Sequence, residues 1–491
     1  MSAAAGRRAL AALLGALAVA GYAPLAVFPL PLLALAALML LWLRAPTTRD
    51  AAVLGWWYGL GFFLTGVSWV YVSLHTFGAM PAPVAGLVTL LFCGFLALFP
   101  AAAGYVVRRV PLGAIGKLLL VGPATWTLLE ALRGVIFTGF PWLELGYAQI
   151  PASPLAGYAP VLGIAGVTLA SALTAGALVL ALIAKSRGAV AGLLVVWAAG
   201  YGLQQVRWTE PVGKPLTVSL LQGNIAQDLK WRPEVVARTL ATYLDLVRGA
   251  EGRLIVLPET ALPLFLEDVP RDYLEALARH AAQRDGDVLI GLPEGSPRDG
   301  YYNSIISVGA APAQVYRKWH LVPFGEFIPL RPLLGPIVGA LAIPLQDFSR
   351  GSATPRPLAV AGQQVAVNIC YEDVFGEEII RQLPAATLLV NASNVAWFGR
   401  SIAPYQHLQI SQARALETGR YMLRATNTGM TAVIDPRGRV AALAPEFTLA
   451  TLTHTVQGHR GATPYVRFGA TPVLALCMLL LLAGLAASRR Q

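Results

Sequence analysis

The chain has 491 residues, of which 56% are hydrophobic and only 13% are charged, and its mean hydropathy is +0.59. These values exclude an ordinary soluble protein and indicate a protein that crosses a membrane several times. The net charge of +11 does not require a nucleic-acid partner, because basic residues that set membrane orientation explain the excess and the sequence holds no nucleic-acid-binding motif.

Apolar segments long enough to cross a bilayer, which takes about 20 residues each, fill both ends of the chain. We predict spans at residues 10–27, 29–43, 52–75, 84–107, 117–136, 160–184, 188–206 and 468–487. The stretch before the last span has the composition of a soluble domain. We therefore predict a membrane domain over residues 1–210, an inserted domain over 211–467, and a final span with a cytoplasmic tail over 468–491.

Basic residues orient these spans by the positive-inside rule. If the N-terminus is cytoplasmic, the short loops on the other side of the membrane hold essentially Arg133 alone. The cytoplasmic ends and loops hold Arg7, Arg8, Arg44, Arg49, Arg108, Arg109, Lys117, Lys185, Arg187, Arg489 and Arg490. The inserted domain then lies outside the cytoplasm, which in a Gram-negative cell is the periplasm. Residues 1–27 also resemble a secretory signal peptide, and cleavage there would leave the later topology unchanged.

Within residues 211–467, short β-rich runs alternate with amphipathic helices, which predicts a layered α/β domain. The expected strands are 217–222, 254–257, 288–292, 304–308, 365–369, 388–390 and 431–434, and the expected helices are 236–247, 270–284, 375–383 and 403–419. This part of the sequence has no internal repeat and no metal-ligand spacing.

Three segments of the inserted domain carry reactive side chains. Glu259 follows a predicted strand, after Pro258 ends its ladder pairing. Lys318 and Glu326 share a loop broken by Pro and Gly, and Cys370 ends another predicted strand. A thiol needs a base to form the attacking thiolate, and acyl transfer also needs positive charge near the developing oxyanion. A glutamate, a lysine and a cysteine meet these needs.

Each of these residues also has an ordinary structural interpretation. A lone cysteine is commonly a small buried apolar residue, and loop carboxylates and lysines are commonly solvated. Because Cys93 and Cys477 lie within predicted spans, Cys370 is expected to be an unpaired thiol in an oxidising compartment. A Cys-His dyad that uses His320 or His407 is the main mechanistic alternative.

The motifs around these residues resemble those of the nitrilase, or carbon-nitrogen hydrolase, superfamily. The matching segments are Leu257-Pro-Glu259, Lys318-Trp-His-Leu-Val-Pro-Phe-Gly-Glu326, Asn368-Ile-Cys370-Tyr-Glu372 and Asn391-Ala-Ser-Asn-Val-Ala-Trp397-Phe-Gly399. Together with the predicted spans, they are similar to the membrane-embedded branch of that superfamily, the apolipoprotein N-acyltransferase family. The resemblance implies a polytopic α-helical membrane protein of about eight transmembrane helices with an inserted α/β domain, a nitrilase-like αββα sandwich.

The same resemblance implies roles for particular residues. The family has a catalytic Glu-Lys-Cys triad, which corresponds here to Glu259, Lys318 and Cys370. The residues with implied supporting roles are Glu326, Tyr371 and Glu372.

Three tryptophans are predicted to contact substrate. Trp231 matches a mobile-arm tryptophan of the family, Trp397 lies in the last matching segment, and Trp142 follows the fifth predicted span, where it could line a lipid entrance. An aromatic belt at the membrane interface would explain Trp142 equally well. Val395 departs from the family's usual Ser-Asn-Asp-Ala-Trp, which puts the polar contacts of that loop in question.

The implied reaction moves an acyl chain from a phospholipid, through a thioester on Cys370, to the α-amine of the N-terminal diacylglyceryl-cysteine of apolipoproteins. The resemblance implies phosphatidylethanolamine as the donor, lipoprotein maturation as the setting and the bacterial inner membrane as the location, with the catalytic domain in the periplasm. Ping-pong kinetics follow from the two-step course, and neither a cofactor nor a metal is expected. A membrane-tethered amidase or nitrilase acting on small periplasmic amides is the alternative enzyme, and a transporter or scaffold with a binding domain is the non-enzymatic alternative.

Overall fold

The computed structural model describes residues 3–488, apart from 297, 299, 330, 333, 334 and 336–346. Arg489 and Arg490, which the topology prediction uses, lie outside the described residues. The chain forms two compact units. The first comprises Met1–Tyr71, Pro81–Arg207 and Arg467–Gln491, and the second comprises Val72–Met80 and Trp208–Val466.

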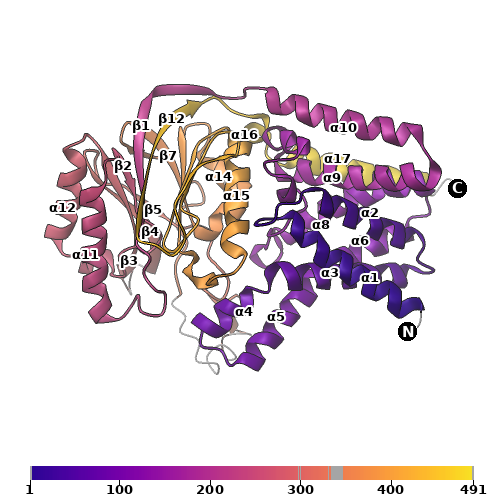
Figure 1. Ribbon diagram of the computed structural model, residues 1–491, viewed down its shortest axis with the longest axis horizontal. Coiled ribbons are helices and arrows are strands. Elements are labelled where there is room, and N and C mark those ends of the chain that lie inside the picture. The colour runs from indigo at the N-terminus through magenta and orange to yellow at the C-terminus, as the bar shows by residue number, and fades with distance from the viewer. Residues whose placement is uncertain are drawn as a thin grey trace. The chain divides into compact units, whose positions relative to one another are not determined.

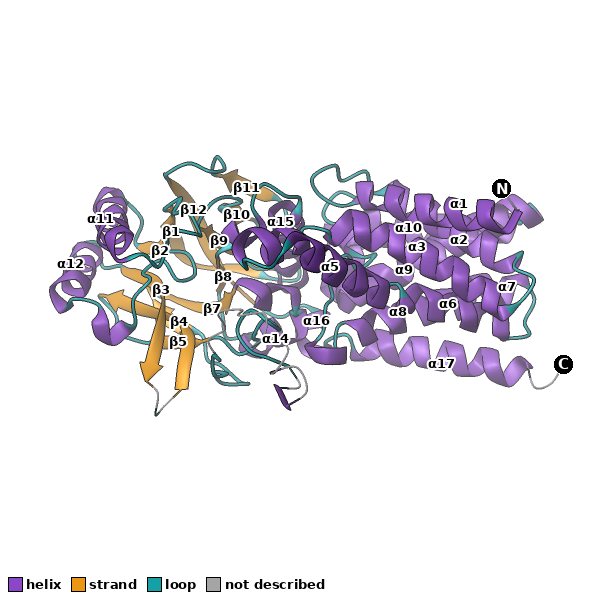
Figure 2. Ribbon diagram, turned by 90° about the horizontal axis from the view of Figure 1, so that it is seen from below, coloured by secondary structure: helices purple, strands orange, loops and turns teal. Residues whose placement is uncertain are grey.

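Helices make up the first unit, and the long ones run side by side (Figure 2). They are α1 (Ala3–Ala18), α2 (Pro29–Leu43), α3 (Thr48–Val67), α5 (Ala82–Leu96), α6 (Leu98–Arg109), α7 (Ala114–Gly116), α8 (Gly122–Arg133), α9 (Ala159–Ala184), α10 (Arg187–Gln205) and α17 (Thr471–Ser488). The short helices α4 (Val70–Val72) and α16 (Pro464–Phe468) lie where the chain passes from one unit to the other.

Each predicted apolar segment is helical over most of its length. Among the described residues, four helical stretches are long and apolar enough to cross a membrane, and a fifth qualifies if α3 and Val70–Phe77, which are bent by 54°, count as one span. The shorter apolar helices include α2 and α17. The predicted number of eight spans is therefore not confirmed.

Glycines allow two helices of the first unit to approach until their backbones touch. A Cβ atom on Gly15 of α1 would overlap the carbonyl oxygen of Tyr58 on α3, and a Cβ atom on Gly61 of α3 would overlap the carbonyl oxygen of Ala12 on α1. Small residues at such crossings are typical of helices in lipid, where close packing replaces the hydrophobic effect as the source of association.

The described residues of the second unit form two six-stranded sheets. The first has the order β12-β1-β2-β3-β4-β5 and contains β1 (Glu210–Gln222), β2 (Leu254–Val256), β3 (Asp287–Ser296), β4 (Gly300–Gly309), β5 (Val315–Arg317) and β12 (Ala450–Arg460). The second has the order β11-β10-β9-β8-β7-β6 and contains β6 (Leu358–Val360), β7 (Gln363–Ile369), β8 (Leu388–Ser393), β9 (Met422–Thr426), β10 (Ala432–Ile434) and β11 (Val440–Leu443). In each sheet, three adjacent parallel strands lie between antiparallel ones.

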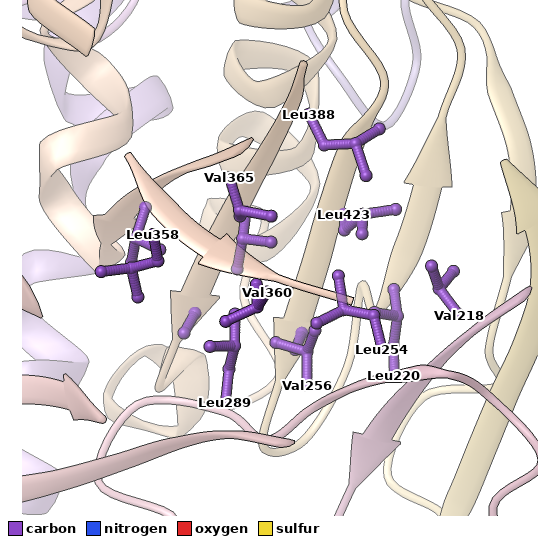
Figure 3. Close-up of a cluster of buried hydrophobic side chains, with 14 of the residues drawn as sticks. Val218, Leu220, Leu254, Val256, Leu289, Leu358, Val360, Val365, Leu388 and Leu423 are labelled. Carbon is purple, nitrogen blue, oxygen red and sulfur yellow. The ribbon is translucent and has the colours of Figure 1, made fainter. Parts of the chain in front are cut away.

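The two sheets bury apolar faces against each other (Figure 3). Fully buried side chains from the first sheet include Val218 and Leu254, and those from the second include Val365 and Leu423. Side chains alternate between the two faces of a strand, so Ala366, next to Val365, belongs to the opposite, outer face of the second sheet. Each buried valine or leucine contributes about 1.5–3 kcal/mol of hydrophobic free energy.

Helices cover the outer faces of both sheets (Figure 1). α11 (Pro233–Gly249) and α12 (Arg271–Ala282) pack on the first sheet through side chains that include Tyr243 and Leu277. α15 (Ala403–Thr418) packs on the second sheet through Leu408. This order of layers confirms the predicted αββα sandwich.

The predicted helix at 375–383 is shorter than expected. α14 covers only Gly376–Ile379, and a 3-10 turn follows at Ile380–Gln382. Pro384 explains the early end, because the residue before a proline avoids the α region, and Leu383 is extended, with φ −109° and ψ 152°.

Five strands in the described part of the chain were not predicted: β5, β6, β9, β11 and β12. In β12 every second residue from Thr451 to Thr455 is threonine, and much of that strand is partly exposed. β9 is fully buried but contains Arg424 and Thr426, so its sequence lacks the apolar run typical of a buried strand.

Gly61→Ala should destabilise the first unit, because the added methyl group would meet the backbone of α1. We expect the thermal unfolding temperature in detergent to fall by about 5 °C. The control is Gly192→Ala on α10, where a Cβ atom would meet nothing within 4 Å, and where alanine should be neutral or stabilising because of its higher helix propensity. Equal unfolding temperatures for the two variants would contradict the close-packing interpretation.

Candidate active site

Cys370 lies where β7 ends and a 3-10 turn, Cys370–Val374, begins. Its φ of 52° is left-handed, which is a costly conformation for a residue with a side chain and is typical of functional sites. Hydrogen bonds hold the backbone around it. The side-chain amide of Asn391 donates to the carbonyl oxygen of Cys370 at 3.2 Å, and the backbone N–H of Ile369 donates to Oε2 of Glu372 at 2.7 Å.

Glu259 follows β2 and lies beside the cysteine. It is near enough to the Cys370 thiol for each group to shift the other's pKa. Its carboxylate accepts hydrogen bonds from the side-chain amide of Asn303 and from the backbone N–H of Asn394, both at 2.8 Å. The Glu259 side chain is therefore a buried carboxylate beside the thiol, as a base for that thiol requires.

Lys318 follows β5 and lies between two carboxylates. Its ammonium group is 3.4 Å from Oε1 of Glu259 and 2.9 Å from Oε2 of Glu326, and the residue is only 1% exposed. Glu326 is held in turn by the backbone N–H of Val322, which donates to its Oε2 at 2.8 Å. Asn303 on β4 joins the two carboxylates, because its amide nitrogen donates to both at 2.8 Å.

These contacts fix the charges of the resting site. Burial alone would raise the pKa of Glu259, but the charge of Lys318 and the hydrogen bonds that the carboxylate accepts lower it below its ordinary value. Burial and the negative charge of Glu259 raise the pKa of Cys370 to about 12. Burial opposes the charge on Lys318, yet Glu326 and Glu259 raise its pKa overall. The site thus rests as a neutral thiol, an ionised base and an ammonium group.

Glu372 joins the cysteine turn to the loop that carries the lysine. Its Oε1 accepts from the backbone N–H groups of Trp319 at 2.6 Å and His320 at 3.0 Å. Its Oε2 accepts from Ile369 and from the hydroxyl group of Tyr316, the latter at 2.8 Å. Burial raises the pKa of Glu372 to about 6. A carboxylate with four donors holds these two segments together, which fits its predicted supporting role.

Tyr371 and the two candidate histidines lie near this turn. The Tyr371 ring meets the rings of His320 and Phe375 at centroid distances of 5.9 and 5.3 Å. His320 contacts Glu378 at 3.1 Å through Nδ1. Burial lowers the pKa of His407 well below its ordinary value. Because Glu259, and neither histidine, is among the groups that shift the pKa of the thiol, the site favours the glutamate as its base.

The three predicted substrate-contacting tryptophans occupy different environments. Trp231 is 55% exposed, and Trp397 is 41% exposed. Trp397 meets the segment 72–80 of the second unit, where Ser73 Oγ donates to its carbonyl oxygen at 2.9 Å and the Phe77 ring lies 6.2 Å away. Trp142 belongs to the first unit and is buried, with its ring 5.1 Å from that of Trp69. The substrate role of all three remains a prediction.

Three asparagines of the site were not predicted to have roles, namely Asn303, Asn391 and Asn394. Asn303 stands within a β-rich run. Asn391 and Asn394 lie in the segment around Val395, the residue that departs from the family's usual sequence and so puts the polar contacts of this segment in question. Single amides in strands and loops carry no periodic signal, so only their spatial neighbours identify them. Among the described residues, no group of three or more His, Cys, Asp or Glu side chains could hold a metal ion.

Known proteins resemble this chain over nearly its whole length. A family described as the apolipoprotein N-acyltransferase N-terminal domain matches residues 14–177, and the carbon-nitrogen hydrolase family matches residues 217–465. A protein of Nitrosomonas europaea named apolipoprotein N-acyltransferase is 57% identical over 96% of this chain and 95% of its own length. Proteins of the same name from Chromobacterium violaceum and Ralstonia nicotianae are 47% and 46% identical, each over 98% of this chain and over 94% and 93% of their own lengths.

The raised pKa of Cys370 predicts slow alkylation at neutral pH, because only the thiolate reacts. In a Cys93→Ala, Cys477→Ala background, we expect the iodoacetamide rate to keep rising through about pH 10 without a plateau. Glu259→Gln should shift this curve to lower pH, since it removes the negative neighbour. A plateau below about pH 8 in the protein that retains Glu259 would contradict the resting charge state.

Proposed function

We propose a function from the premise that this chain belongs to the apolipoprotein N-acyltransferase family. It transfers an acyl chain from a phospholipid to the α-amine of the N-terminal diacylglyceryl-cysteine of apolipoproteins, through a thioester on Cys370. One observation carries this proposal: Glu259 and Lys318, whose carboxylate and ammonium groups lie 3.4 Å apart, are close enough to the Cys370 thiol for their charges to shift its pKa.

The first half-reaction acylates the cysteine. Glu259 takes the thiol proton while the sulfur attacks the ester carbonyl of the phospholipid, so that a C–S bond forms and the carbonyl oxygen becomes an oxyanion. Lys318 supplies positive charge near that oxyanion. The intermediate then collapses, the C–O bond breaks, and the proton on Glu259 passes to the departing oxygen of the lysophospholipid. A thioester on Cys370 remains.

The second half-reaction transfers the acyl chain to the protein acceptor. The neutral α-amine of the lipidated N-terminal cysteine attacks the thioester, and Glu259 accepts the proton that the nitrogen loses. The C–S bond breaks, an amide is formed, and the sulfur regains its proton from Glu259. Because the first product leaves before the second substrate reacts, the kinetics are ping-pong.

A membrane location suits both substrates. Moving an acyl chain from lipid to water costs about 0.8 kcal/mol per CH₂ group, so an enzyme that acts on long chains benefits from apolar surroundings. The apolar helices of the first unit supply these. We place the protein in the bacterial inner membrane with the second unit in the periplasm, and we take phosphatidylethanolamine as the donor. Trp142, Trp231 and Trp397 are the proposed substrate contacts.

The direct test is intact mass spectrometry of the purified protein after incubation with phosphatidylethanolamine without an acceptor. We expect one acyl adduct that hydroxylamine removes, as a thioester requires, and none on Cys370→Ala. A folded protein that forms no adduct but hydrolyses small amides would overturn the acyltransferase proposal and support the amidase alternative.

A pair of variants separates the lysine from the histidine alternative. Lys318→Met should lower the acylation rate by about 10²-fold or more, since it removes the cation near the oxyanion. His320→Ala should keep the rate within about threefold of the unsubstituted protein, because the ring contacts Glu378 rather than the thiol. The opposite ranking, with both variants folded by circular dichroism, would favour a Cys-His mechanism.

A further inference from the structure

The segment 224–231, which ends in the exposed Trp231, is docked beside the proposed base. Asn427 holds its beginning, because its carbonyl oxygen accepts from the N–H of Asn224 at 2.8 Å and its side chain both accepts from and donates to the backbone of Ile225, at 3.0 and 2.8 Å. Asn427 itself is 1% exposed. The beginning of the segment is therefore held by hydrogen bonds between its backbone and a buried asparagine.

Asn394 connects this docked segment to the Glu259 carboxylate. Its side-chain amide donates to Oε1 of Gln227 at 2.7 Å, and its side-chain oxygen accepts from Asn427 at 3.3 Å. Its backbone N–H donates to Oε2 of Glu259 at 2.8 Å. Gln227 and Asn394 are 8% and 4% exposed, so water does not readily replace either partner, and losing one would leave the other unsatisfied.

The segment meets Glu259 at a second point. The ammonium group of Lys230 is 2% exposed and lies 3.5 Å from the carbonyl oxygen of Glu259. Segment 224–231 thus reaches the carboxylate of this residue through Asn394 and its backbone through Lys230. The next side chain, Trp231, is the exposed one.

We propose that Asn394 is a positioning residue for Glu259 and that its amide couples this base to the docking of segment 224–231. The proposal rests on the proposed function and extends it. While the segment is docked, Gln227 and Asn427 fix the Asn394 side chain, which keeps its backbone N–H aimed at the Glu259 carboxylate. When the segment undocks, Asn394 loses that support and the base loses a donor.

The consequence should appear in the acid limb of the pH profile. A hydrogen bond to a carboxylate favours its ionised form, and the bond from Asn394 is among the contacts that lower the pKa of Glu259. Weakening this bond should raise that pKa, so that more of the base is protonated and inactive at low pH.

Other charged groups face Glu259, and none of them accounts for such a shift. Lys318 stays protonated, since its carboxylate neighbours raise its pKa. Burial lowers the pKa of Lys230 to about 8, which belongs to the basic limb. Glu326 and the Cys370 thiol complete the surroundings. The pKa of Glu372, about 6, also lies in the acid limb. Two of the variants below change the contacts of Asn394 but leave the contacts of Glu372 unchanged.

The test measures single-turnover acylation of Cys370 by phosphatidylethanolamine in the full-length protein in detergent, from about pH 3 to 9. The variants are Asn394→Ala, which removes both side-chain anchors, and Gln227→Met, which keeps the size of the side chain but loses the acceptor. The matched control is Gln412→Met, which also loses one glutamine hydrogen bond, from Nε2 to the carbonyl oxygen of Gly438 at 2.8 Å, on the helix α15.

We expect the acid limb of Asn394→Ala to move up by about one pH unit, which is a tenfold loss of rate at pH values below the limb. The limb of Gln227→Met should move up by less. The control should keep the limb of the unsubstituted protein. Hydrogen exchange of the 224–231 amides should quicken in the first two variants only. If Asn394→Ala fails to fold, Gln227→Met carries the test.

Folded variants whose acid limb coincides with that of the control would overturn the proposal and reduce Asn394 to a structural role. An unsubstituted protein that forms no hydroxylamine-sensitive adduct would overturn the proposed function and this inference together. The two failures are distinguishable, because only the second concerns the protein without substitutions.

Discussion

The site depends on one buried charge, the ammonium group of Lys318. An isolated ammonium group in a protein interior costs several kcal/mol, and the carboxylates of Glu259 and Glu326 offset that cost here. The three groups carry a net charge of −1, which explains why a thiolate is disfavoured in the resting state. When the thiol proton moves to Glu259, the total charge of the cluster does not change. The proposed attack by Cys370 would therefore create no additional buried charge.

The sandwich makes this cluster possible, because its members come from different sheets. Glu259 and Lys318 follow β2 and β5 of the first sheet, whereas Cys370 follows β7 of the second. The interaction between the thiol and Glu259 crosses from one sheet to the other. It persists only while the valines and leucines between the sheets stay packed, so the apolar core sets the distance on which the proposed chemistry relies.

The place of a candidate residue beside a strand could be predicted where its chemistry and the strand pattern before it agreed. The strand 365–369 and the cysteine after it, and Glu259 after Pro258, were visible in the sequence alone. Asn303 and Asn394 were not, because their partner Glu259 is 44 and 135 positions away in the chain. No local pattern encodes a contact of that kind. The polar strands β9 and β12 were not predicted for a related reason, because tertiary packing rather than an apolar run determines that they form strands. The number of spans could not be settled from apolar length either, because α3 bends before the segment that joins the second unit.

The pairing of β1 with β12 bears on how the protein is made. These strands are the first and last of the second unit, and they form an antiparallel ladder from Glu210 with Arg460 to Gln222 with Ala450. A chain that emerges from the ribosome in order cannot complete this sheet until residue 460 has been synthesised. During that interval β1 has a free edge, which is a site for unwanted pairing with other chains. The enzyme should therefore need protection by chaperones until its last strand arrives.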